Sequence, residues 1–160
     1  MAKAGIFNED DRVELIEGEI VEMSPIGPRH AGTVNRLIGC FIPLQMERRV
    51  TITVQNPIRL GKYSEPQPDL ALLKPRPDFY STSHPEPKDI LLIVEIAETS
   101  VDIDRQVKIP LYAQAGIPEV WLLDLSEEKI KVYQEPTPQG YRKVDKLERV
   151  KLYPLTPSPN

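Results

Sequence analysis

The chain has 160 residues, enough for one domain with a full hydrophobic core and too few for two ordinary ones. Apolar residues make up 40% and charged residues 28%, as in ordinary soluble globular proteins, and no stretch approaches the roughly 18 apolar residues of a membrane span. The formal net charge of −4 argues against a protein that coats DNA through a global positive field.

Basic residues, cysteine content and the N-terminal sequence bear on the binding partners and the location of the protein. A basic patch can still bind DNA if the fold gathers residues such as Arg29, Arg48, Arg49, Arg59 and Lys62, although each of them also fits a solvated surface. The single cysteine excludes an internal disulfide framework and a thiolate cluster for zinc. We also find no secretory signal, so we expect a cytoplasmic protein with no membrane partner.

The N-terminal third of the sequence predicts a hairpin followed by a helix. Residues 12–16 and 19–23 flank Glu17-Gly18, a two-residue turn signal with a glycine available for positive φ. From about Arg29 to Arg48, apolar residues recur at helical spacing, with Pro43 inside the pattern. We expect a helix that kinks at Pro43 or ends and restarts there, with Cys40 packed on its inner side.

The middle of the chain reads as strands separated by prolines. Residues 50–54 and 58–60 are rich in β-branched and aliphatic residues on either side of Asn56-Pro57. Residues 69–73 and 90–97 are continuous apolar runs, typical of strands covered on both faces. The connection between them, residues 74–89, is long and contains several prolines, and loops of this kind are usually functional or mobile.

The C-terminal half predicts a crossover and a second hairpin. Either Asp102 or Asp104 can cap a helix that runs to Ala115, with Gly116 and Pro118 beyond its end. Residues 119–125 form another buried strand, which should be parallel to 90–97 because a helix joins them. Residues 129–134 and 141–144 follow as outer strands. The sequence therefore predicts an α/β domain with a mixed β-sheet.

One acidic residue stands out against this background. Glu95 lies in the apolar run 90–97, where a carboxylate is costly unless it is paired, hydrogen-bonded or bound to a cation. Asp69 begins the other buried run, so the two acids can form an oxygen-rich corner that suits a hard divalent cation. Lys108 in the following helix is a candidate third member, although it could instead pair with Asp104 on a solvated helix face.

Several motifs in this order resemble a known family. They are ELIEGEIVEMSP at 14–25, His30, Pro68-Asp69, VEIAETS at 94–100, Asp104 with Lys108, and YAQAGIPEVW at 112–121. Together they resemble the Uma family of putative restriction endonucleases, in the PD-(D/E)XK phosphodiesterase superfamily. The resemblance spans roughly residues 12–135 and implies a restriction-endonuclease-like core, a mixed β-sheet flanked by helices with an N-terminal hairpin.

The resemblance also implies roles for individual residues. Asp69 and Glu95 would hold Mg²⁺, with Mn²⁺ as a substitute, and Lys108 would orient the attacking water or stabilise the phosphorane charge. The superfamily usually has a lysine two residues after the glutamate, where this chain has Ala97. For His30 there are two alternatives: it contacts phosphate or a metal-bound water, or it is a helix-capping or surface residue. Glu14 is a candidate additional acid.

We therefore predict a metal-dependent endonuclease-like hydrolase of phosphodiester bonds, acting on double-stranded DNA as a homodimer. The domain should span residues 12–153, between an N-terminal tail (1–11) and a flexible C-terminal tail (154–160). The alternative is a non-catalytic nucleic-acid-binding or protein-interaction module on the same fold, which Ala97 keeps open.

Overall fold

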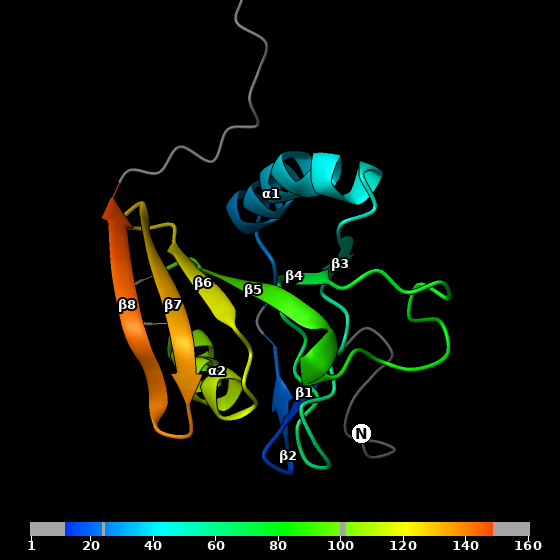
Figure 1. Ribbon diagram of the computed structural model, residues 1–160. Helices are drawn as coiled ribbons and strands as arrows, with labels where there is room; N and C mark the ends of the chain where they lie inside the picture. The colour runs from blue at the N-terminus through cyan, green and yellow to red at the C-terminus, as the bar shows by residue number, and fades with distance from the viewer. Residues whose placement is uncertain (1–11, 24, 100–101, 149–160) are drawn as a thin grey trace, which may run out of the picture.

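The computed structural model describes residues 12–23, 25–99 and 102–148, and Figure 1 shows how they are arranged. The predicted tails, 1–11 and 154–160, lie outside the described residues. The elements in chain order are β1 (Val13–Ile16), β2 (Glu19–Glu22), α1 (Pro28–Met46), β3 (Thr51–Val54), β4 (Leu70–Leu73), the 3₁₀ turn η1 (Pro87–Asp89), β5 (Ile90–Ala97), α2 (Ile103–Gln114), β6 (Glu119–Asp124), β7 (Lys129–Thr137) and β8 (Gly140–Glu148).

The strands form a two-stranded hairpin and a six-stranded sheet. The hairpin is β1–β2, and the sheet has the order β3-β4-β5-β6-β7-β8. Among the described strands, β5 and β6 are the parallel pair, joined by α2, and the other neighbours are antiparallel. The predicted mixed α/β fold and the crossover are therefore confirmed.

A hydrophobic core lies on each face of the sheet, with one helix over each (Figure 1). Successive side chains of a strand point to opposite faces. On β5, Leu92, Val94 and Ile96 belong to the core under α1, whereas Ile93 belongs to the core under α2. This double coverage explains why 90–97 lacks polar alternation, and it places Glu95 on the α2 face.

The hairpin turn has the backbone conformation that its residues suggest. Glu17 and Gly18 have φ values of 49° and 84°, the left-handed pair required by the tightest hairpin turns. The turn is also tied to the loop before β4, because the backbone N–H of Gly18 donates to the Tyr63 carbonyl at 2.8 Å. The predicted hairpin is therefore confirmed, and its register, with Ile16 opposite Glu19, is the one that a two-residue turn gives.

Two local predictions were wrong, those for residues 58–60 and for Cys40. Residues 58–60 do not form a strand; Ile58 and Leu60 donate to the carbonyls of Pro66 and Ser64 in an irregular loop, where nearby prolines cannot complete a ladder. Of the two outcomes expected at Pro43, an end and restart of the helix is excluded, because α1 continues through this proline to Met46. Cys40 is exposed and does not pack inward.

The C-terminal hairpin and α2 agree with the prediction, apart from the bounds of the strands. The final hairpin is longer than predicted, with β7 and β8 each spanning nine residues, and β8 is an edge strand as expected. Asp102 caps α2, since its side chain accepts from the backbone N–H of Arg105 at 3.2 Å. No helix in the described ranges has the length and apolarity that a bilayer span requires.

The turn conformation gives a direct test of the hairpin. We expect Gly18→Ala to lower the free energy of unfolding by about 1–2 kcal/mol, because an added Cβ meets no atom but must adopt the left-handed conformation. Gly32→Ala, in α1, also meets no atom and should instead stabilise by about 0.5–1 kcal/mol. Urea denaturation measures both, and equal effects of the two substitutions would contradict the turn assignment.

Candidate active site

The sheet register brings the two predicted acids together. Leu70 is opposite Val94, so the preceding residue, Asp69, lies beside Glu95 at the point where β4 begins. The backbone N–H of Asp69 donates to Glu95 Oε1 at 3.3 Å, and the N–H of Ile96 donates to Asp69 Oδ2 at 2.7 Å. Both acids are fully buried, with 0% exposure. Two carboxylates thus converge in the sheet interior on its α2 face.

Helix α2 supplies a cation and a hydroxyl to this pair. Lys108 Nζ lies 2.9 Å from Glu95 Oε2 and 2.6 Å from Glu14 Oε1. The Tyr112 hydroxyl, one turn further along the helix, donates to Glu95 Oε2 at 2.5 Å. Lys108 is only 3% exposed, so the solvated helix-face reading of this residue is wrong; the side chain of Asp104 lies outside what the structure describes.

Asp69 has its own partners, one on each helix. His30 Nε2 lies 3.1 Å from Asp69 Oδ1, and Arg105 Nη2 lies 3.3 Å from both carboxylate oxygens. His30 is the third residue of α1 and only 3% exposed, whereas the helix N-cap is Gly27, so His30 is neither a cap nor a surface residue. Helices from both faces therefore reach the same end of β4.

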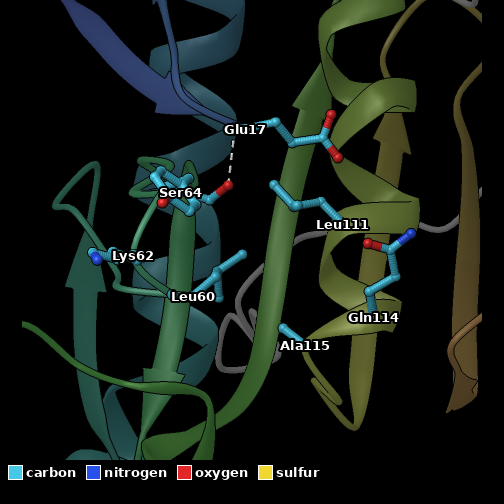
Figure 2. A pocket seen from close by; sticks show the side chains of 9 residues that line it. Glu17, Leu60, Lys62, Ser64, Leu111, Gln114 and Ala115 are labelled. Carbon is cyan, nitrogen blue, oxygen red and sulfur yellow. Dashed lines mark hydrogen bonds between the residues drawn. The ribbon is translucent and has the colours of Figure 1, made fainter.

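Glu14 is brought into the site by the anchored hairpin. Its Oε1 accepts from the backbone N–H of Gln67 at 2.7 Å in addition to Lys108, and the side chain is buried. Figure 2 shows how the hairpin turn is fixed: the backbone N–H of Glu17 donates to Ser64 Oγ at 3.0 Å. Because this contact holds β1 against the segment before β4, Glu14 stays within reach of α2.

A groove lies beside the contact between Glu17 and Ser64, but it does not contain the buried acids. It has a volume of about 380 Å³ and lies between the hairpin turn, loop 60–64 and the second half of α2 (Figure 2). Its lining includes Leu60, Lys62, Leu111 and Gln114, and it contains none of the predicted catalytic residues. The buried acids instead lie one turn of α2 away, at Lys108.

The electrostatics of the two acids differ. Burial alone would raise the pKa of Asp69, but the hydrogen bond from His30 and the charge of Arg105 lower it to about 2. For Glu95, burial prevails over the opposing charge of Lys108 and raises the pKa to about 7. Asp69 is thus firmly ionised at neutral pH, whereas Glu95 is close to its protonation midpoint.

The nearby acids raise the pKa values of the two cationic side chains of the site. Burial would lower the pKa of Lys108, but the negative charges of Glu95 and Glu14 raise it above the ordinary value. The pKa of Arg105 is likewise raised by Asp69 and Glu95 against the effect of burial. The acids and the two cations thus favour each other's charged forms, and the three carboxyl groups outnumber the two cations.

Comparison with known proteins identifies the family. The Uma2 family, described as "Putative restriction endonuclease", matches residues 2–158. The chain belongs to the Uma2 family. The crystal structure of a putative nuclease from Anabaena variabilis ATCC 29413 has a similar fold, with a TM-score of 0.66 and 16% identity over 85% of this chain and 76% of that one. No curated protein sequence matches at a significant level.

The donor set of this Uma2 chain fits a hard divalent cation. Asp69 and Glu95 supply carboxylate oxygens, which Mg²⁺ prefers, and Mg²⁺ commonly binds through one or two carboxylates while keeping several waters. Among the described residues, no group of three or more histidine, cysteine and acidic residues could hold a metal by itself. Buried Nδ1 of His30 and Nε of Arg105 have no hydrogen-bond partner in the described residues.

Sequence reasoning missed two members of this Uma2 site. Arg105 and Tyr112 lie three residues before and four after Lys108, so all three occupy one face of α2. This spacing was available in the sequence. From the sequence alone, however, Arg105 would be taken for an exposed residue of the first helical turn. Tyr112 fits the apolar stripe of the helix, so nothing in the sequence indicates that its hydroxyl contacts Glu95.

The buried ion pairs of this Uma2 chain can be tested in metal-free buffer. We expect Lys108→Met to lower the free energy of unfolding by about 3–5 kcal/mol at pH 8, because it leaves Glu95 and Glu14 buried without their cation. The folded-state pKa of Glu95 exceeds its unfolded value, so the folded variant binds more protons and its stability should increase as pH falls from 8 to 5.

The matched control removes an exposed lysine. Lys143 on β8 lies 3.9 Å from Asp145, and both side chains are about half exposed, so Lys143→Met should change stability by less than about 0.5 kcal/mol. Chemical denaturation across this pH range measures both variants. A loss for Lys108→Met no larger than that for Lys143→Met would show that the buried network does not need its lysine.

Proposed function

We propose that this chain is a metal-dependent endonuclease-like hydrolase that cleaves phosphodiester bonds in DNA. The observation that carries the proposal is the convergence of two fully buried carboxylates, Asp69 and Glu95, with Lys108 Nζ 2.9 Å from one of them. A structural network rarely retains so many charges in an apolar sheet, because burying each of them is costly. Membership of a family described as "Putative restriction endonuclease" supports the same reading.

Asp69 and Glu95 would hold Mg²⁺, or Mn²⁺ in its place. When bound there, the ion would polarise the scissile phosphate and lower the pKa of a coordinated water. Asp69 is suited to this role because its pKa of about 2 keeps it ionised. Glu95 has a pKa of about 7 without a metal, so its ionised form is available near neutral pH.

Lys108 would provide the positive charge that, in the PD-(D/E)XK superfamily, usually comes from a lysine on the same strand, two residues after the glutamate. The usual position is taken by Ala97, which is buried and has no charge. Lys108 arrives instead from α2 and reaches the same carboxylate. Glu14 fixes it through a 2.6 Å ion pair, so the ammonium group is held where charge develops on the phosphate.

His30 and Arg105 would bind the phosphate beside the acids. Each contacts Asp69, and each retains a buried nitrogen without a partner among the described residues. A guanidinium matches phosphate oxygens in a planar, two-point geometry, and an imidazole N–H donates one further hydrogen bond. These donors would orient the scissile group toward the acid pair.

We further propose double-stranded DNA as the substrate and a homodimer as the active form. Two symmetric copies place one acid site on each strand of a duplex, which is the simplest way to cut both. A cytoplasmic location remains our prediction from the sequence, which has a single cysteine.

A second candidate is a non-catalytic nucleic-acid-binding or protein-interaction module. The contacts that favour it are the ones that neutralise the acids without a metal: Arg105 contacts both oxygens of Asp69, and Lys108 contacts both Glu14 and Glu95. In that case the network would only maintain the fold. Isothermal titration with Mg²⁺ or Mn²⁺ separates the two, since a module should give no heat that depends on Asp69.

A cleavage assay tests the proposed activity. Plasmid and short duplexes incubated with Mg²⁺ or Mn²⁺ should be cut by the wild type and left intact in EDTA. Asp69→Asn and Glu95→Gln keep the size of each side chain but remove the charge, and each should reduce the rate by at least about 100-fold. Asp145→Asn, at an exposed acid of β8, should cleave at the wild-type rate.

Circular dichroism should show that these variants are folded before their rates are compared. Cleavage that survives both charge-removing substitutions would place the chemistry elsewhere. Absence of cleavage by the wild type with either metal, across plasmid and duplex substrates, would favour the non-catalytic module.

Metal affinity gives a separate test, because Arg105 lies where it would compete with the ion for Asp69. We expect Arg105→Gln to bind Mn²⁺ at least about tenfold more tightly than the wild type, since removing a cation at 3.3 Å leaves the Asp69 charge uncompensated. Arg142→Gln, at an exposed position of β8, is the control and should not change the affinity. Unchanged or weaker Mn²⁺ binding by Arg105→Gln would contradict this competition.

A further inference from the structure

The two carboxylate oxygens of Glu95 have different surroundings. Oε2 accepts from the Tyr112 hydroxyl at 2.5 Å and lies 2.9 Å from Lys108 Nζ, and both of these residues belong to α2. Oε1 instead accepts from the backbone N–H of Asp69 at 3.3 Å. Hydrogen bonds from N–H to oxygen are ordinarily about 2.9–3.0 Å long, so this contact is a weak one. Oε1 is therefore the oxygen that is more available to a further ligand.

Tyr112 is the more directional of the two donors on α2. Its side chain is fully buried, with 0% exposure, and belongs to the hydrophobic core on the α2 face of the sheet. A phenol ring has only two side-chain torsions, so close packing in a core determines where its hydroxyl lies. A lysine ammonium is a compact charge with three donors on a flexible stem, and it attracts a carboxylate without fixing its plane. The Tyr112 hydroxyl thus determines which oxygen of Glu95 faces α2.

This orientation matters because the other acid lies on the Oε1 side. Oε1 is the oxygen that contacts Asp69, through the backbone N–H of that residue. The Asp69 carboxylate is held at the same end of β4, where its Oδ2 accepts from the N–H of Ile96 at 2.7 Å. One ion can bind to both acids only if Glu95 presents an oxygen toward Asp69. With Oε2 held by the donors of α2, that oxygen is Oε1.

We propose that Tyr112 is a positioning residue for the metal site: its hydroxyl holds Oε2 of Glu95 toward α2 and leaves Oε1, beside Asp69, to ligate the divalent cation. The inference rests on the proposed function, because it takes Asp69 and Glu95 to hold the ion. Tyr112 touches neither the ion nor the DNA and acts through Glu95. Hydrogen-bond partners of ligating carboxylates typically contribute roughly 10–100-fold to metal affinity or activity.

Isothermal titration with Mn²⁺ tests the inference without any cleavage. Tyr112→Phe keeps the ring and its packing but removes the hydroxyl, and it should bind Mn²⁺ at least about tenfold more weakly than the wild type. The hydroxyl is neutral, so its removal leaves the charge of the site unchanged and affects the affinity through the orientation of Glu95. The expected direction is therefore opposite to that for Arg105→Gln.

The matched control is Tyr141→Phe. The Tyr141 hydroxyl donates to the Ile117 carbonyl at 2.8 Å, and its ring packs against the same core as Tyr112. This variant also loses one hydroxyl hydrogen bond, but that bond does not involve either acid. Both variants should therefore have a lower midpoint of urea denaturation than the wild type, whereas Tyr141→Phe should bind Mn²⁺ with wild-type affinity.

The metal dependence of cleavage gives a second readout that a purely structural role would not produce. At low Mn²⁺ concentration Tyr112→Phe should cut DNA more slowly than the wild type, with an unchanged KM for the duplex. Saturating Mn²⁺ should restore most of the rate, because the hydroxyl controls how well the site holds the ion rather than the reaction of the bound phosphate.

Three results would overturn the inference. The first is Mn²⁺ binding by Tyr112→Phe that is as tight as that of the wild type or tighter. The second is an equal loss of affinity in Tyr141→Phe, which would show a general effect of removing a hydroxyl. The third is a crystal structure with Mn²⁺ in which Oε2 ligates the ion and the Tyr112 hydroxyl has left Glu95.

These experiments separate the inference from the proposed function. A wild type that binds Mn²⁺ and cleaves DNA, together with a Tyr112→Phe variant of equal affinity, removes the positioning role and leaves the nuclease assignment intact. A wild type whose Mn²⁺ affinity depends on the Tyr112 hydroxyl, but which cleaves neither plasmid nor duplex, supports the positioning role and removes the catalytic assignment. A wild type that binds no Mn²⁺ overturns both.

Discussion

The structure depends on the compensation of buried negative charge at the start of β4. Asp69 and Glu95 lie in the sheet interior, where an unpaired carboxylate is among the costliest groups a protein can bury. The elements around them supply the compensation: α1 brings His30, and α2 brings Arg105 and Lys108. The two helices and the sheet are thus joined by charge as well as by hydrophobic contact.

The same compensation explains why the site is suited to chemistry. Its acids have pKa values on opposite sides of the ordinary range, about 2 for Asp69 and about 7 for Glu95, because their partners and their desolvation differ. Such separation is typical of functional sites, where one group must stay charged and another must respond to a ligand. A divalent cation would take over part of the charge that Arg105 and Lys108 now balance.

Much of the fold could be predicted from the sequence, and the reasons for the failures are physical. Periodicity and turn residues identified β5 and the hairpin turn at Glu17-Gly18, and they narrowed the cap of α2 to Asp102 or Asp104. Residues 58–60 were misread because strand propensity does not reveal whether a partner strand is available beside prolines. For the site, Glu95 could be singled out because it is an acid within an apolar run of sequence. No local pattern, however, shows that the Arg105 side chain points inward to Asp69.

The central claim is that Asp69 and Glu95 together bind one divalent cation, and a crystal structure with Mn²⁺ tests it most directly. Anomalous diffraction should show a single Mn²⁺ peak between the two carboxylates, with the Arg105 guanidinium withdrawn from Asp69 relative to the 3.3 Å contact described above. Crystals that bind Mn²⁺ elsewhere, or that retain the contact between Arg105 and Asp69 with no peak beside it at saturating Mn²⁺, would contradict the account.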